Sequence, residues 1–224
     1  MIDTTRFQPV LLLLLSLSAG FTDAYIYLHA KVFPANMTGN SVVLAMSFVN
    51  HNLSASVLAM LCLAGFIAGT ALGSLLLYIK VPLPYWNKST NKVLLVEAVL
   101  FMLLSVLMLT SREKSWLVIA SSVAMGLQGV AMSQLGVKGI TTIVITGTIS
   151  SAIAGLVSRE IAELEHQPVK DLNTKWQFLT WIIYTAGAGA ACTPVIAVST
   201  FPFLVPFLIL LICIICADYF LVKS

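Results

Sequence analysis

The chain has 224 residues, of which 59% are hydrophobic and 9% are charged, and its formal net charge is +3. Soluble domains carry roughly 25% charged residues, so this composition excludes an ordinary soluble fold and predicts an integral membrane protein in contact with the lipid bilayer. The basic residues form no block of the kind that binds nucleic acid. The apolar runs are too long for barrel strands, which predicts an all-α membrane helix bundle with residues 1–224 as one membrane domain.

Six apolar runs are long enough to cross the roughly 30 Å hydrocarbon core as helices. They are Pro9–His29, Ser54–Ile79, Val93–Thr110, Trp116–Leu135, Trp176–Val198 and Pro202–Val222. The Pro-rich stretch Val81–Asn91 is expected to be an interfacial loop, and the hydrophilic stretch Ser158–Lys175 a solvated linker. Pro194 should bend its helix. Glu97 is interpreted as a carboxylate near the membrane surface, beside Lys92.

Two polar, turn-forming stretches interrupt this pattern. Pro34–Ser41 precedes a run, Val42–Val49, that is too short to cross alone, and Thr141–Ser150 repeats the Thr-Gly-polar core 108 residues later. Inside a membrane, backbone groups that leave a helix must find partners in protein or in water. The two stretches therefore predict a duplicated unit, with one broken or re-entrant helix at a Thr-Gly motif in each half.

Small and polar residues at matched spacing support the duplication. In the first helix they recur at i, i+4, i+7 and i+11, which makes one stripe that should face the protein interior. The same spacing recurs at a constant offset of 106 residues. The two sets are Ser16, Gly20, Asp23 and Tyr27, and Ser122, Gly126, Gly129 and Ser133. They predict repeat one over residues 1–110 and repeat two over residues 111–224, an organisation that recurs in transporters.

The distribution of Lys and Arg distinguishes two topologies. If all eight segments cross, that is, the six long apolar runs and the two Thr-Gly segments, seven basic residues lie on the cytoplasmic side and five outside. If the two Thr-Gly segments dip in and return, the split becomes nine to three, with Lys31, Arg112 and Lys114 outside. The second split fits the positive-inside rule better, so we favour two inverted repeats with re-entrant segments and a cytoplasmic N-terminus.

A glycine stripe is expected to mediate helix packing. Gly65, Gly69 and Gly73 form a double GxxxG pattern, and the small-residue face around Gly187 echoes it in the second half. Such faces let backbones approach closely in lipid. Packing within the chain is the favoured interpretation, and a homodimer seam is the alternative.

The motifs resemble those of the YoaK-type family of small bacterial inner-membrane proteins. The resemblance rests on Gly20–Ala24 and Asn36–Asn40 in the first half, and on Gly126–Gln128 and Thr146–Thr148 in the second. It covers nearly the whole chain, although the family pattern has an Asn where this chain has Gly129. It implies a multi-pass protein of the bacterial inner (cytoplasmic) membrane and supplies no substrate.

The sequence favours a transporter or channel-like protein for a small polar or anionic solute, without enzymatic activity, cofactor or metal. Helix N-termini at the two breaks would suit an anion, and Asp23 would couple transport to a proton or cation, because an ionisable residue inside a membrane is costly and usually functional. Alternatively, Asp23 caps the broken helix. The candidate solute-binding residues are Asp23, Tyr27, Asn36, Thr38, Gly39, Asn40, Gln128, Thr146, Gly147 and Thr148.

Two other functions stay open. A non-catalytic assembly or regulatory subunit could use the glycine helix to bind a partner. An intramembrane lipid-processing enzyme is less favoured, because the chain has no DxxxD, HExxH or paired His motif.

Overall fold

The computed structural model describes residues 8–78, 88–110, 113–135, 145–165, 174–197 and 201–223. All regular structure in these ranges is helical, which confirms the all-α prediction there. The helices are α1 (Gln8–Ala30), α2 (Met37–Val49), α3 (Leu53–Tyr78), α4 (Lys88–Thr110), α5 (Lys114–Ser133), α6 (Ile145–Leu164), α7 (Thr174–Ala191), α8 (Pro194–Ala197) and α9 (Leu204–Lys223).

Four of the described helices, α1, α3, α4 and α5, are long and apolar enough to cross a membrane. A helix rises 1.5 Å per residue, so the 20 to 26 residues of these helices give about 30 to 39 Å of length, which matches the hydrocarbon core. The chain is therefore a membrane protein. The apolar stretches Met37–Val49 of α2 and Leu204–Tyr219 of α9 are shorter.

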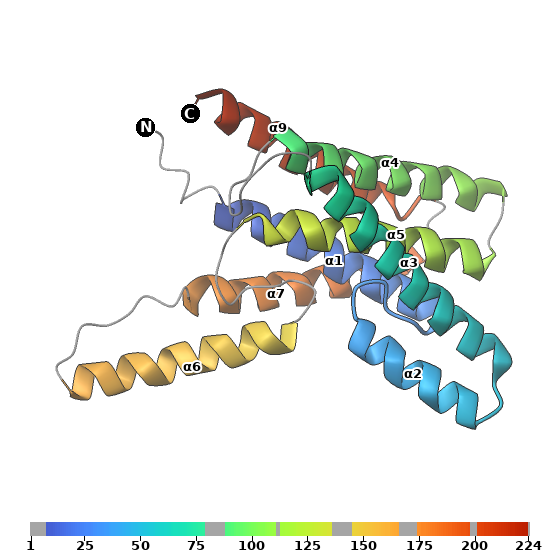
Figure 1. The fold of residues 1–224 in the computed structure, drawn as a ribbon, viewed down its shortest axis with the longest axis horizontal. Coiled ribbons are helices and arrows are strands. Elements are labelled where there is room, and N and C mark those ends of the chain that lie inside the picture. The colour runs from blue at the N-terminus through green and yellow to red at the C-terminus, as the bar shows by residue number, and fades with distance from the viewer. Residues whose placement is uncertain are drawn as a thin grey trace.

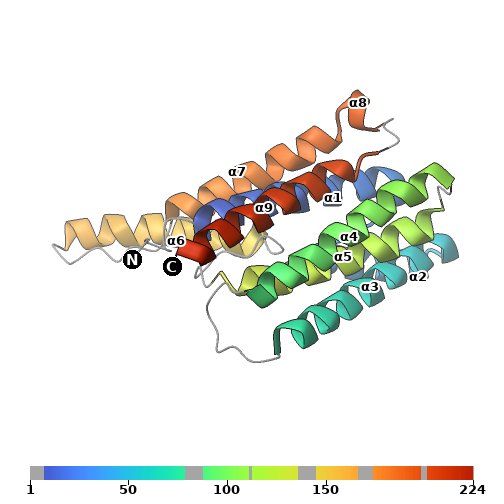
Figure 2. The same ribbon diagram turned by 90° about the horizontal axis from the view of Figure 1, so that it is seen from above.

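The bundle is built around α1, which packs against α5, α7 and α9. Two long helix pairs dominate the packing, α1 with α7 and α3 with α5, and α4 lies against both α5 and α9. Figures 1 and 2 show these pairs as neighbouring ribbons. The N-terminal half of the chain thus contacts the C-terminal half along several helices rather than at one seam.

Glycines allow α1 and α7 to touch backbone to backbone. A methyl group on Gly20 would overlap the carbonyl oxygen of Tyr184, and one on Gly187 would overlap the carbonyl oxygen of Leu17. Both positions therefore require glycine for this close approach. By contrast, nothing lies within 4 Å of the position where a methyl group on Gly189 would sit.

The α3–α5 pair is joined in the same way. A methyl group on Gly69 would overlap the carbonyl oxygen of Val123, and one on Gly126 would press on the carbonyl oxygen of Phe66. Gly65 and Gly73 also face α5, where they meet Ile119, Ser122, Leu127 and Val130. The glycine stripe of α3 is thus occupied by a helix of the same chain.

Three local predictions were wrong. The stretch Ser158–Lys175 does not begin as a linker, because α6 continues to Leu164 through good helix formers such as Glu, Ala and Leu. The stretch Val81–Asn91 ends in helix, since α4 begins at Lys88. Pro194 does not bend a continuous helix: α7 ends at Ala191 and Pro194 is the first residue of α8, a position that proline favours.

Candidate functional site

The chain reverses sharply between α1 and α2. Lys31, directly after α1, has a positive φ of 60°. The side chain of Asn40 then closes the loop, because its Oδ1 accepts from the Phe33 amide at 2.9 Å and its Nδ2 donates to the Phe33 carbonyl at 2.6 Å. Asn36 caps α2 by accepting from the Gly39 amide at 3.0 Å. These polar residues satisfy backbone groups that a membrane would otherwise leave without partners.

Asp23 lies at the centre of this arrangement and is 3% exposed. Its Oδ1 accepts a hydrogen bond from the Ala35 amide at 2.7 Å, and its Oδ2 accepts one from the Tyr184 hydroxyl at 2.6 Å. The first bond draws the loop before α2 back along α1. The second reaches α7, so a single carboxyl group links the first break to the second half of the chain.

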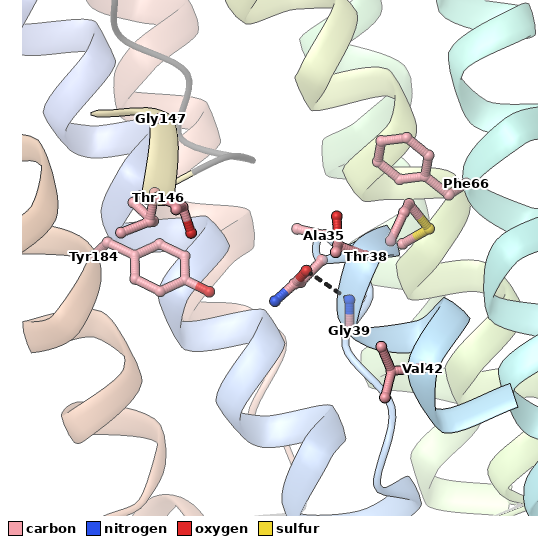
Figure 3. Close-up of a pocket in the computed structure, with 11 residues that line it drawn as sticks. Ala35, Thr38, Gly39, Val42, Phe66, Thr146, Gly147 and Tyr184 are labelled. Carbon is pink, nitrogen blue, oxygen red and sulfur yellow. Dashed lines mark hydrogen bonds between the residues drawn. The ribbon is translucent and has the colours of Figure 1, made fainter. Parts of the chain in front are cut away.

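The two Thr-Gly motifs border one cavity of about 840 Å³. Its first wall is formed by the start of α2, with Asn36, Thr38 and Gly39, and its second by the start of α6, with Thr146 and Gly147. Figure 3 shows Thr146 beside Tyr184 on one side of the space, and Phe66 on the opposite side beyond Thr38. Ala35, Met37, Val42 and Ile145 complete the lining.

Five of the ten candidate solute-binding residues line this cavity, namely Asn36, Thr38, Gly39, Thr146 and Gly147. The other five lie elsewhere. Asp23 contacts the cavity residue Tyr184, as described above. Asn40 holds the loop and also donates to the Cys62 sulfur at 3.1 Å. Residues 136–144, which include the first part of the second polar stretch, lie outside the described residues.

Gln128, Tyr27 and Thr148 serve other contacts. Gln128 is buried and its Nε2 donates to the Leu15 carbonyl at 2.8 Å, which joins α5 to α1. Tyr27 is 39% exposed and its ring stacks on Phe33 with centroids 4.5 Å apart. The stripe that begins at Ser16 therefore faces the interior through Asp23 but not at Tyr27. Thr148 is fully buried within α6.

Sequence reasoning missed the two aromatic residues that face the cavity, Phe66 and Tyr184. One signal was present in the sequence: Phe66 stands three residues before Gly69, and Tyr184 stands three residues before Gly187. The two positions are therefore equivalent relative to the packing glycines of α3 and α7.

The position of Glu97 was also predicted wrongly. Glu97 is fully buried, whereas Lys92 is exposed. Five residues on a helix correspond to a rotation of about 140°, so the two side chains project from different faces of α4. The helix also starts at Lys88, which puts Glu97 about two and a half turns inside it rather than one.

Comparison with known proteins agrees with the resemblance inferred from the motifs. Residues 11–216 match the family model described as "Protein of unknown function (DUF1275)". The chain is also 31% identical over 189 residues to the UPF0700 transmembrane protein YoaK of Bacillus subtilis (strain 168), a match that covers 81% of each chain. No solved structure matches.

Proposed function

We propose that this chain, which belongs to the DUF1275 family and is similar to a transmembrane protein of Bacillus subtilis, is a transporter or channel-like protein for a small polar or anionic solute. We place it, with several membrane crossings, in the bacterial inner membrane. The observation that carries the proposal is the cavity between the two Thr-Gly breaks, since transporters with internal repeats bind their solute where broken helices of the two halves meet.

The first support is the exchange of helices between halves. If α1–α4 form one repeat and α5–α9 the other, α1 of the first repeat packs on α7 of the second, and α5 of the second packs on α3 of the first. The packing of α4 on α5 likewise corresponds to that of α9 on α1. A two-fold relation between the repeats requires this reciprocal pattern.

The glycine contacts repeat the same relation residue by residue. The contact of Gly20 with Tyr184 corresponds to that of Gly126 with Phe66, and the contact of Leu17 with Gly187 corresponds to that of Val123 with Gly69. The α1 and α5 members of these pairs are 106 residues apart, and the α3 and α7 members are 118 residues apart. The offset of 106 is the one that relates the two polar stripes.

The second support concerns re-entry. The hydrogen bond from Ala35 to Asp23 returns the chain to a point seven residues before the end of α1, or about 10 Å back along its axis. From there α2 runs outward again before α3 begins. In Figure 1, α2 and α6 run from the middle of the molecule towards opposite ends, as two re-entrant helices entering from opposite faces would do.

The cavity lining favours a small solute with a polar or anionic group. The first turn of α2 borders the space, and helix N-termini carry amides without intrahelical partners together with a partial positive charge. Thr38 and Thr146 add hydroxyl groups. The two sides of the cavity differ in polarity, because the equivalent positions 66 and 184 carry Phe and Tyr.

A thermal-shift panel of small anions and metabolites, run on the detergent-purified protein, tests the solute site. A ligand present at a hundred times its Kd should stabilise the fold by about 2.7 kcal/mol. Thr146→Val should reduce the binding free energy of that ligand by about 1 kcal/mol, the usual contribution of one hydrogen bond. The matched control is Thr110→Val, an exposed position on α4. Equal loss in both variants, or a panel without any ligand, would count against the proposal.

Asp23 is the candidate coupling residue, because protonation or cation binding there would alter its bonds to Ala35 and to Tyr184. Asp23→Asn keeps the size of the side chain and removes the charge. We expect this variant to fold and bind the solute but to lose proton- or cation-coupled uptake in proteoliposomes. Wild-type uptake would remove Asp23 from the coupling role, and failure to fold would assign it to capping the break.

A further inference from the structure

Glu97 is a buried acid that the solute cavity does not use. It lies on α4, and none of the residues that line the cavity comes from α4 or α9. The side chain is fully buried, and within the described part of the chain neither carboxyl oxygen has a hydrogen-bond partner. Asp23, the other buried carboxyl group among the described side chains, has two partners.

The residues one turn from Glu97 on either side along α4, Leu94 and Phe101, are apolar and fully buried. Phe101, one turn further along α4, stacks on Phe203 with centroids 5.9 Å apart, and Tyr25 of α1 meets Phe203 edge-on at 5.3 Å. On α9, the buried thiol of Cys213 is close enough to Glu97 to interact with it electrostatically. Asp218, further along α9, accepts a hydrogen bond through its Oδ1 from the Nδ2 of Asn91 at 2.6 Å. The described charged residues at α5 are both exposed: Lys114 is the first residue of the helix, and Glu113 lies directly before it.

A carboxylate in this position would be a buried charge inside a membrane-spanning helix without a hydrogen-bond partner among the described residues, which is costly. Binding one proton removes the charge and leaves a neutral acid of unchanged size. We propose that Glu97 is a proton-binding site, separate from the solute cavity, and that the folded protein carries this side chain as the neutral acid at neutral pH. This site stands whether or not the cavity transports a solute.

The test uses dicyclohexylcarbodiimide, an apolar reagent, on the full-length protein in nanodiscs at neutral pH. A protonated carboxyl gives its proton to a carbodiimide nitrogen while its oxygen bonds to the central carbon, and rearrangement leaves a stable N-acylurea that contains the whole reagent. An exposed Glu is ionised at this pH and reacts poorly. We expect one adduct at Glu97 by peptide mass spectrometry, and none from a charged, water-soluble carbodiimide.

Two variants identify the reacting group. Glu97→Gln should abolish the adduct, and Asp23→Asn should leave it in place. An infrared spectrum of the unchanged protein made with isotopically labelled glutamate gives an answer that needs no variant to fold, because a protonated Glu shows a carbonyl band that shifts with the label. The absence of both the adduct and the shifted band in folded protein would overturn the proposal, as would equal labelling by the water-soluble reagent.

Discussion

At the scale of single residues, Asp23 joins three segments of the chain. Its two oxygens bind the Ala35 amide before α2 and the Tyr184 hydroxyl on α7. Hydrogen bonds to a charged acceptor are stronger than neutral ones, and a buried acceptor that loses its donor is destabilised by its lost solvation. Asp23 therefore has a structural role, and Tyr184 combines its bond to Asp23 with a place at the cavity wall.

Tyr184→Phe should measure that role. The change keeps the ring at the cavity and removes the hydroxyl donor, so Asp23 keeps one partner of two. We expect a loss of about 1 to 3 kcal/mol in the free energy of unfolding, followed as the thermal unfolding midpoint in detergent. Tyr27→Phe, at a residue 39% exposed on α1, should leave the midpoint unchanged. An unchanged unfolding midpoint for Tyr184→Phe would show that the hydrogen bond to Asp23 contributes nothing to stability.

At the scale of helices, backbone contact at glycines sets the distance between partners. The α1–α7 and α3–α5 pairs each contain two glycines at which a methyl group would strike a carbonyl oxygen of the facing helix. Lipid tails are as apolar as the helices, so close van der Waals packing is a principal source of association in a membrane. These contacts therefore determine which helices pair.

Gly187→Ala and Gly189→Ala make a matched test on one helix. The Gly187 change places a methyl group against the Leu17 backbone and should destabilise the protein by about 1 to 3 kcal/mol, the usual cost of overpacking. The Gly189 change enters open space and should be neutral or slightly stabilising, since Ala favours helix more than Gly does. Equal unfolding midpoints for the two variants would contradict the α1–α7 contact.

At the scale of the whole molecule, the arrangement of α2 and α6 distinguishes the two topologies. With re-entrant segments, Lys88 faces the cytoplasm and Lys114 faces outward. With eight full crossings the sides are exchanged, so Lys88 faces outward and Lys114 faces the cytoplasm. Lys88 and Lys114 are the exposed first residues of α4 and α5, so reagents can reach both.

A cysteine introduced at position 88 or at position 114 tests the topology in intact cells. Cys192, which is exposed, and Cys216, which is half-buried, are replaced by Ser in both variants. The buried Cys62 and Cys213 are kept, and Cys62 contacts Asn40 and Ser122. A membrane-impermeant maleimide should label position 114 and spare position 88. The reverse pattern would establish eight full crossings and reject re-entry.

Much of the helical framework followed from the sequence alone. Hydrophobic runs and helix length reflect the thickness of the membrane, and both are local properties of the chain. The expected α1 span, Pro9–His29, differs from the helix by one residue at each end. The polar stretch Pro34–Ser41 was recognised as a break because Asn, Gly and Pro in an apolar context have a local physical meaning. The errors at Lys88 and Leu164 arose where composition was mixed, since polar helix formers also occur in solvated segments.

The partners of these segments were decided by tertiary structure. Tyr184 donates to Asp23 across 161 residues of sequence, and Gln128 donates to Leu15 across 113. No local pattern ranks one apolar neighbour above another, because in a membrane the choice depends on which backbones fit closely together. The same reason explains Glu97. Its place along α4 was visible in the sequence, but only the packing of α4 against α5 and α9 determined that its carboxyl group is buried, without a hydrogen-bond partner among the described residues.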